Sequence, residues 1–415
     1  MPTTAAVAEF AADVTYDGLP EAVREAAKRR VLDAVGVVVG SVGRAPTDAV
    51  RRAVTAGSAT GRSRLWGSEL GGSPPDAALY NAALAGCGND ATFLSPALSG
   101  TGGTTAAVLS AAEARSAAGE AVLAGLAVAH EIRGELAWNA PLDGFHPATH
   151  GAVAAAAGAA RASGLDAAAI GSAVGLAATG ATLAVEGENA ESLAVGRAAR
   201  AGVNACLLAD AGVEGPDALD GAGGWGDLVG PFDLDLDPGC ERVQDAAILP
   251  YGTHPYAQTA VEAAVTLAGD AALDPADIGS VTVETFADAV PAVSPTAVAA
   301  ALVDRAVAAP PAERADLRPV ADATEVRSHE GLTGRAERGE VPARVVVETR
   351  DSAVHEAELA RFTGHPARPA AWGTVEEKFH ALAGDRYGAE RRTEILDTVR
   401  GLEAETVAEL SRLLD

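Results

Sequence analysis

The sequence predicts a mainly α-helical protein. We expect a large all-helical domain over residues 1–270, a smaller α+β domain over 271–370, and C-terminal helices over 371–415 that return to the helical domain. The length of 415 residues is two to three times that of a typical domain, which favours two domains. Apolar residues recur at helical spacing through most of the first domain, whereas two-residue alternation begins only after Asp274.

The helices of the first domain are indicated by apolar spacing and by the residues at their ends. Pro20 suits the first turn of the helix that follows it, and Val31 and Val35 lie on one face of that helix. The further segments with helical spacing of apolar residues are separated nearly everywhere by glycine or Asp-Gly, as expected where a helix ends. The further stretches cover residues 46–56, 75–87, 104–118, 119–137, 148–163, 166–180, 194–212 and 255–269.

Strands are predicted only in the second domain. Residues 280–286, 343–350 and 354–361 alternate with a period of two, and the last two segments form a hairpin candidate because three residues join them. Apolar residues recur again at helical spacing over residues 295–308. After a segment rich in Pro and Gly, this spacing continues from Thr374 to the C-terminus.

Charge excludes several classes of partner. Lys and Arg total 31 against 57 Asp and Glu, which gives a net charge of −26. Nucleic acid and anionic membrane surfaces are therefore not expected as partners, since both need a basic face. Lys28 and Lys378 are the two lysines of the chain. An acidic, Ala-rich, Lys-poor chain is typical of salt-accumulating microbes, and a GC-rich genome gives part of the same pattern.

The three cysteines, Cys87, Cys206 and Cys240, are far apart and form no C-x-x-C motif. A disulfide framework or a zinc site is therefore not expected, and a reducing cytoplasm fits. The N-terminal residues have no basic region followed by an apolar one, so they do not read as a signal peptide. The most apolar stretch, residues 151–185, carries Arg161 and is better explained by buried helices than by a membrane span.

Standard catalytic motifs are absent from the sequence, so the candidate catalytic residues are histidines in predicted loops. The Gly-rich segment 221–226 follows no predicted strand, and the acidic run 233–237 lacks the glycine and terminal glutamate of an EF-hand. His146 lies in a short loop between two helical stretches, and His254 lies near the domain junction, where clefts form. His130 falls within a helix, where a packing role is expected.

Several short motifs, taken in their order and spacing, resemble the MmgE/PrpD family, which includes 2-methylcitrate dehydratase, cis-aconitate decarboxylase and iminodisuccinate epimerase. The resemblance runs from about residue 8 to the end, and the segment 129–132 and the last motif look most like the methylcitrate dehydratase branch. The motifs are Val31-Leu-Asp-Ala-Val-Gly36, Asn81-Ala-Ala-Leu-Ala85, Gly144-Phe-His-Pro147, Gly196-Arg-Ala-Ala199 and Ala257-Gln-Thr-Ala-Val-Glu-Ala-Ala264.

The resemblance implies a helical domain with an α+β lid domain, a homodimer, no cofactor, and a site between the domains. Substrates of the family are small di- and tricarboxylates. Dehydration or decarboxylation develops charge next to a carboxylate, so the site needs a general acid or base and groups that bind carboxylates.

The resemblance also points to individual site residues. His146 matches the loop histidine of the family, and Asp90 and Thr92 match its Asp-rich motif if one residue is gapped. For carboxylate binding, Arg197 and Arg200 are the nearest arginines, and His254 is a further candidate. We therefore expect His146, Asp90 and Thr92 as catalytic residues, Arg197, Arg200 and His254 as binding residues, and no metal.

The sequence departs from the family where its chemistry should lie. Residues 99–102 replace the His-Pro-Gly motif without a histidine, and Glu191 and Ile248 stand at the two lysine positions. Three hypotheses follow. The protein is a lyase with a remodelled site, a homologue that has lost catalysis and acts as a binding or partner subunit, or an isomerase or epimerase on a related acid.

Overall fold

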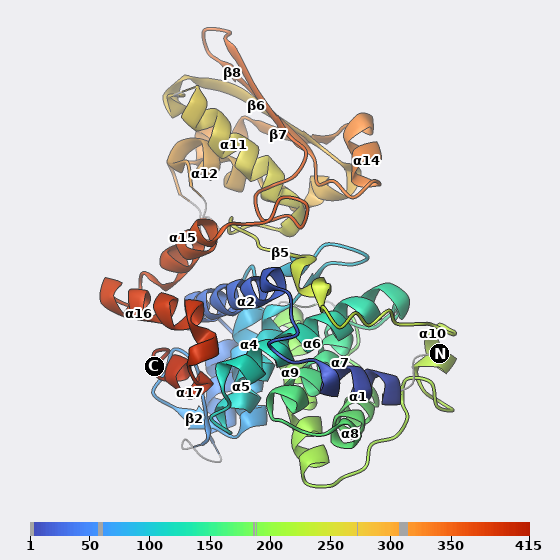
Figure 1. Ribbon diagram of the computed structural model, residues 1–415. Coiled ribbons are helices and arrows are strands. Elements are labelled where there is room, and N and C mark those ends of the chain that lie inside the picture. The colour runs from blue at the N-terminus through green and yellow to red at the C-terminus, as the bar shows by residue number, and fades with distance from the viewer. Residues whose placement is uncertain (1–3, 57–60, 186, 188, 272, 307–313) are drawn as a thin grey trace. The chain divides into compact units, whose positions relative to one another are not determined.

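Helices make up most of the protein, as the sequence predicts, and the chain divides into two units (Figure 1). The computed structural model describes residues 4–56, 61–185, 187, 189–271, 273–306 and 314–415. Unit 1 contains residues 1–246 and 382–415, and unit 2 contains residues 247–381. Among the described helices, none is both long enough and apolar enough to cross a lipid bilayer.

Unit 1 is built from helices, with short two-residue strands between them. Its helices are α1 (Thr4–Asp13), α2 (Glu21–Gly40), α3 (Thr47–Thr55), α4 (Pro74–Ala85), α5 (Gly102–Glu113), α6 (Gly119–Asn139), α7 (Ala148–Ala162), α8 (Ala167–Ala178), α9 (Ala190–Asp210), α10 (Trp225–Val229), α16 (Ala389–Arg400) and α17 (Val407–Arg412). The remaining elements are β1 (Ser63–Arg64), β2 (Gly71–Gly72), β3 (Thr92–Phe93), β4 (Ser99–Gly100), η1 (Glu241–Gln244) and η5 (Leu402–Ala404).

The helices of unit 1 approach one another closely because their contact faces carry Ala and Gly. A Cβ atom at Gly125 of α6 would lie 2.5 Å from the carbonyl oxygen of Gly158 on α7. A Cβ atom at Gly202 of α9 would lie 2.5 Å from the carbonyl oxygen of Ala152, also on α7. Such distances are not tolerated by real side chains, so these crossings require glycine and bring the helix backbones into direct contact.

Unit 2 is a four-stranded sheet covered on one face by helices. Its strand order is β7-β6-β8-β9, with β6 and β7 parallel and the other two pairs antiparallel. The elements are η2 (Pro255–Ala257), α11 (Gln258–Asp270), η3 (Pro275–Asp277), β6 (Ile278–Thr285), η4 (Ala287–Ala292), α12 (Pro295–Asp304), α13 (Arg318–Asp322), β7 (Thr324–Ser328), α14 (Glu330–Ala336), β8 (Ala343–Thr349) and β9 (Val354–Leu359). The chain crosses between the units at β5 (Ala246–Ala247) and within α15 (Trp372–Ala383).

The division between the units lies at residue 246, not at the expected residue 270. Helix α11 accounts for the difference, because it packs on β8, β9 and α12. Its buried residues Val261 and Ala264 belong to the same core cluster as Val283 and Val345 of the sheet. The predicted hairpin is present as β8 and β9, whereas β7 was not expected from the sequence.

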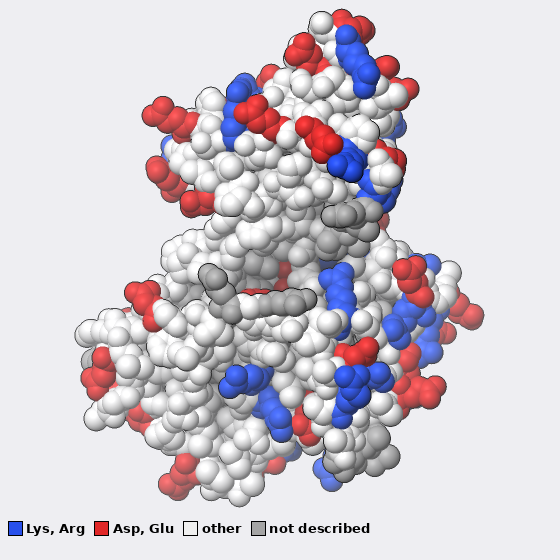
Figure 2. All heavy atoms as spheres, turned by 180° about the vertical axis from the view of Figure 1, so that it is seen from behind, with Lys and Arg blue, Asp and Glu red and all other residues white. Residues whose placement is uncertain are grey.

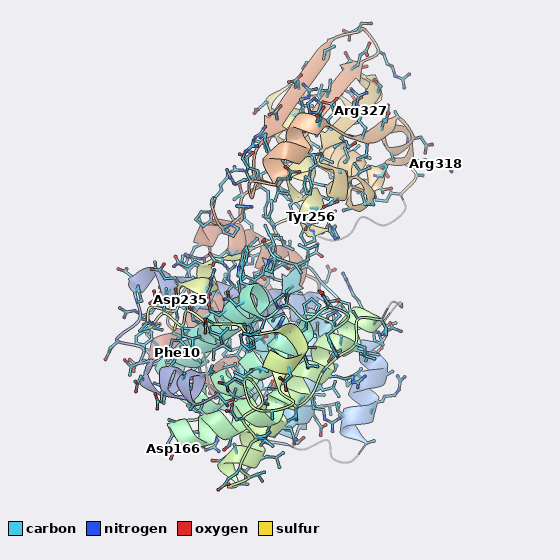
Figure 3. The ribbon with its side chains drawn as sticks, turned by 90° about the vertical axis from the view of Figure 1, so that its right-hand side faces the viewer. Phe10, Asp166, Asp235, Tyr256, Arg318 and Arg327 are labelled. Carbon is cyan, nitrogen blue, oxygen red and sulfur yellow. The ribbon has the colours of Figure 1, made fainter. Side chains whose placement is uncertain are left out.

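Charged side chains are mixed on the surface. On the face drawn in Figure 2, basic side chains stand beside acidic ones over both units, and the described residues form no broad basic patch there. On the sheet of unit 2, the buried carboxylate of Glu284 accepts hydrogen bonds at 2.7 Å from Arg327, which is labelled in Figure 3, and from Arg344. These bonds connect three neighbouring strands.

Two buried carboxylates of α6 accept hydrogen bonds from main-chain N–H groups of the segment that follows α10. Oε2 of Glu135 accepts from the main-chain N–H of Asp235 at 2.7 Å, and Oε2 of Glu131 accepts from that of Arg242 at 3.0 Å. Asp235, labelled in Figure 3, keeps its own side chain exposed, as predicted for this acidic run. Burial raises the pKa of Glu131 to about 7, and the nearby Glu135 raises it further while the main-chain donors lower it.

This raised pKa predicts a pH dependence of stability. Between about pH 4.5 and 7 the folded state binds the Glu131 proton more tightly than the unfolded state does, so the free energy of unfolding falls as the pH rises. Relative to Glu131→Gln, the wild type should lose on the order of 3 kcal/mol across this range. Denaturant unfolding at several pH values measures the difference. The exposed Glu120→Gln on the same helix keeps Glu131, so it should show the same pH profile as the wild type. Equal pH profiles for wild type and Glu131→Gln would refute the prediction.

Candidate functional site

His146 lies in the short loop between α6 and α7 of unit 1. The loop is fixed by main-chain hydrogen bonds to the segment before α9. The His146 N–H donates to the Thr182 carbonyl at 2.7 Å, and the Ala184 N–H donates to the Gly144 carbonyl at 3.2 Å. The side chain of His146 is 13% exposed. The histidine therefore has a defined position at the edge of the helical unit, within reach of solvent.

Both imidazole nitrogens of His146 have partners. Nδ1 accepts a hydrogen bond at 3.1 Å from the N–H of Ala148, the first residue of α7, so the hydrogen-bond network places the proton on Nε2. Nε2 then donates to Oε2 of Glu191 at 2.7 Å. Glu191 lies in the first turn of α9, and its side chain is 63% exposed. We refer to these two residues as the His146–Glu191 pair.

Asp90 is buried between α4 and β3, beside the start of α5. Its Oδ2 accepts a hydrogen bond from the N–H of Gly102, the first residue of α5, where a negative charge is favourable. A Cβ atom at Gly102 would lie 2.7 Å from Oδ2, and one at Gly100 would lie 2.5 Å from Oδ1. Both glycines are therefore needed to seat the carboxylate. Thr92, on β3, donates from its hydroxyl to the Asp90 carbonyl at 2.8 Å.

Arg133 is a buried cation in the middle of α6, and it is only 4% exposed. Nη1 donates to the Thr104 hydroxyl at 2.6 Å, and Nη2 donates to the Ser99 hydroxyl at 2.7 Å. Burial lowers the pKa of Arg133 to about 10, and the charges of Asp90 and Glu191 act in the opposite direction. The guanidinium therefore stays protonated at neutral pH, and its electrostatic interactions connect Asp90 to the His146–Glu191 pair.

A small cavity borders Arg133 between α5, α6, α7 and α9. Its volume of about 10 Å³ is space for about one water-sized group. Small residues form its walls, because the contact between α7 and α9 is built on Ala and Gly. The lining residues are Gly103, Thr104, Arg133, Ala148, Gly151, Val195, Ala198 and Ala199.

Of the three predicted binding residues, Arg197 and Arg200 lie in unit 1, and His254 lies in unit 2. Arg197 and Arg200 are exposed on α9, because the helical repeat directs its small residues inward and turns these arginines outward. Arg200 forms an ion pair with Asp76 at 3.2 Å. His254 is exposed in unit 2, where its Nδ1 accepts from the N–H of Tyr256 at 3.2 Å. Neither arginine lines the cavity beside Arg133.

The two positions at which the family lysines are missing differ in their surroundings. Glu191 hydrogen-bonds His146. This lysine position therefore lies within the group formed by His146, Glu191, Asp90, Thr92 and Arg133, which we call the cluster. Ile248 is buried in unit 2. Lys28 lies on α2 and forms an ion pair with Glu403 at 2.8 Å. Within the described ranges, no group of three or more His, Cys, Asp or Glu side chains is arranged to hold a metal ion.

Fold and cluster together define a mainly helical protein with a histidine–carboxylate pair near a buried cation. The family model for the MmgE/PrpD N-terminal domain matches residues 5–234, and that for the MmgE/PrpD C-terminal domain matches residues 251–403. The first match covers more than half of the chain and contains the whole cluster. The chain belongs to the MmgE/PrpD family. No individual curated protein matches it.

Sequence reasoning missed Arg133 and the role of Glu191. The signal for Arg133 was present, since it is a charged residue inside the long apolar helix predicted over 119–137, where burial of a charge needs a reason. Glu191 was noted only as a missing lysine. Its contact with His146 depends on how the loop before α9 folds back onto residues 144–146, and no spacing rule gives that.

Proposed function

We propose that the protein is a lyase of the dehydratase or decarboxylase type, acting without a cofactor on a small di- or tricarboxylate such as 2-methylcitrate. The observation that carries the proposal is the hydrogen bond of 2.7 Å between His146 Nε2 and Glu191 Oε2. A carboxylate that holds an imidazole in one orientation is a recurrent device for acid–base catalysis. Within the pair, His146 lies in the loop that the resemblance matches to the family's site histidine.

The pair can take up one proton and return it. In a dehydration, His146 Nδ1 gives up the hydrogen bond from the Ala148 N–H and removes a proton from the carbon next to a substrate carboxylate. Glu191 stabilises the imidazolium, and the C–O bond to the hydroxyl breaks. The proton then passes from the pair to the departing hydroxyl, and water leaves, so the pair ends the cycle unchanged. Histidine is the side chain most often used for such proton transfers. Asp90 and Thr92 support the cluster through the start of α5 and through β3.

A second candidate is favoured by the residues at the family lysine positions. Glu191 and Ile248 supply no ammonium group there, and Lys28 is engaged with Glu403. If lysine is required for the elimination, the protein is an isomerase or epimerase that returns the proton to carbon, or a binding subunit without catalysis. The isomerase or epimerase removes a proton from carbon as the lyase does, whereas the binding subunit transfers no proton.

The family resemblance also leads us to propose a homodimer in the cytoplasm. Large apolar side chains exposed on unit 1 support such an interface, among them Leu183 at 62% and Leu228 at 66% exposure. Light scattering that gives the mass of a single 41.4 kDa chain would contradict the dimer.

The variant Glu191→Gln tests the proposed acid–base role. Glutamine keeps the size of the side chain but removes the charge that stabilises a protonated His146, so turnover should fall by about 10²-fold. The matched control is Asp210→Asn, at the other end of α9, whose carboxylate pairs with Arg115. The control should keep wild-type turnover. Equal turnover in wild type and Glu191→Gln would remove the support for the pair.

A further inference from the structure

We propose that Arg133 binds a carboxylate of the ligand, in an anion site formed with the first turns of α5 and α7. The chemical class of the ligand, a small carboxylate, rests on the proposed function. The anion site itself rests on the burial, contacts and cavity of Arg133, so it can be tested without any turnover.

The first argument is the incomplete pairing of a buried charge. The hydrogen bonds of the Arg133 guanidinium go to two neutral hydroxyls, those of Ser99 and Thr104. Its Nε–H has no hydrogen-bond partner. Asp90 and Glu191 interact with the guanidinium electrostatically, but its side-chain hydrogen bonds within the described ranges go to hydroxyls. A buried cation without a hydrogen-bonded anionic partner costs several kcal/mol, and a bound carboxylate removes part of that cost.

The second argument is the composition of the cavity beside Arg133. Gly103 and Thr104 belong to the first turn of α5, and Ala148 is the first residue of α7. The dipoles of helix N-termini favour anions, while the N–H groups of Gly102 and Ala148 already donate to Asp90 and His146. These helices have 12 and 15 residues, long enough for a full dipole. The volume of about 10 Å³ admits one carboxylate oxygen, so the ligand enters with one end only.

The third argument is the glycine that faces the guanidinium. A Cβ atom at Gly151 would lie 3.6 Å from Arg133 Cζ and 3.4 Å from the Thr104 hydroxyl oxygen. These are ordinary van der Waals distances, so alanine fits at this helical position without a clash. The absence of a side chain there leaves open the space in front of the cation. Packing alone would favour alanine, because glycine destabilises a helix interior by about 1 kcal/mol.

Arg30 shows what a purely structural buried arginine looks like in this fold. It is 6% exposed, and its guanidinium donates to the main-chain carbonyls of Val243 and Ala246. Arg30 thereby joins α2 to η1 and β5, and like Arg133 it has one buried nitrogen without a hydrogen-bond partner, Nη1. Arg133 differs in that its partners are hydroxyls and that it lines a cavity. Arg30 therefore serves as a control for the effect of removing a buried guanidinium.

The test is calorimetric titration with succinate of wild type, Arg133→Met, Gly151→Ala and Arg30→Met. Wild type should bind succinate, and Arg133→Met should weaken binding by about 10- to 100-fold, because a charge-assisted hydrogen bond contributes on the order of 1.5–3 kcal/mol. Gly151→Ala should weaken binding while its melting temperature stays equal or rises. Arg30→Met should melt earlier and bind succinate as wild type does.

Two outcomes separate this proposal from the proposed function. Binding that depends on Arg133 and Gly151, in a protein that turns over no carboxylate, supports the anion site and refutes the lyase. Turnover with an unchanged KM in Arg133→Met refutes the anion site and leaves the lyase. Gly151→Ala remains decisive if Arg133→Met does not fold. Wild-type affinity for succinate in folded Gly151→Ala, or no succinate binding by wild type, overturns the proposal.

Discussion

Replacing His146 with alanine is expected to lower turnover of a small carboxylate substrate by about 10²–10⁴-fold, the usual contribution of a positioned acid or base. The melting temperature should change little, since the imidazole makes one hydrogen bond to an exposed glutamate and one to the start of α7. Steady-state kinetics and a thermal melt of the same preparation measure both quantities. A structural His146 would instead lose stability and keep the activity of its folded fraction.

The double variant His146→Ala with Glu191→Gln tests whether the two residues act as one catalytic unit. Residues that act as one unit are strongly non-additive, because removal of either already abolishes the shared function. Turnover of the double variant should therefore be close to that of His146→Ala. If the two losses multiply, each residue acts independently, and the pair is not the functional unit.

Gly119→Ala is expected to produce the largest loss of stability in unit 1, about 3 kcal/mol. A Cβ atom at this first residue of α6 would lie 1.6 Å from the carbonyl oxygen of Leu402. The Gly119 N–H also donates to the Glu405 carbonyl at 2.8 Å. The alanine methyl must therefore push η5 and the segment before α17 away from α6.

Denaturant unfolding of Gly119→Ala measures this loss. The matched control is Gly388→Ala, at the start of α16, where a Cβ atom meets nothing within 4 Å and the backbone is extended with φ of −61°. Because Gly388 is the N-cap of α16 and alanine is a poor N-cap, the control should lose at most about 1 kcal/mol. Equal stability of Gly119→Ala and wild type would show that the C-terminal segment does not pack on α6 as described.

The sequence predicted the helices of unit 1 and the hairpin of unit 2 well, because local spacing determines both. It misplaced α11, because the apolar face of a helix does not indicate which neighbour covers it, and Val261 packs on the sheet. The contact between Gly119 and Leu402 joins positions far apart in the chain, and local patterns carry no information about such pairs.

For the site, sequence comparison selected His146 and Asp90, and the structure places both in unit 1 near Arg133. It selected Arg197 and Arg200 as binding residues because they follow a family glycine. A helix turns each successive residue by about 100°, so Arg197 and Arg200, three positions apart, lie on the same exposed face of α9. The partners of Arg133 and Glu191 depend on tertiary contacts, which bring α5, α6, α7 and α9 together.

The central claim is that the His146–Glu191 pair moves a proton next to a substrate carboxylate. The most direct measurement is nuclear magnetic resonance in D₂O of small hydroxylated di- and tricarboxylates, 2-methylcitrate first, incubated with wild type or His146→Ala. We predict deuterium at the carbon beside a carboxylate, in substrate or product, with wild type, and a rate at least about 10²-fold lower with His146→Ala. The account is contradicted if no compound gains deuterium, or if both proteins incorporate it at the same rate.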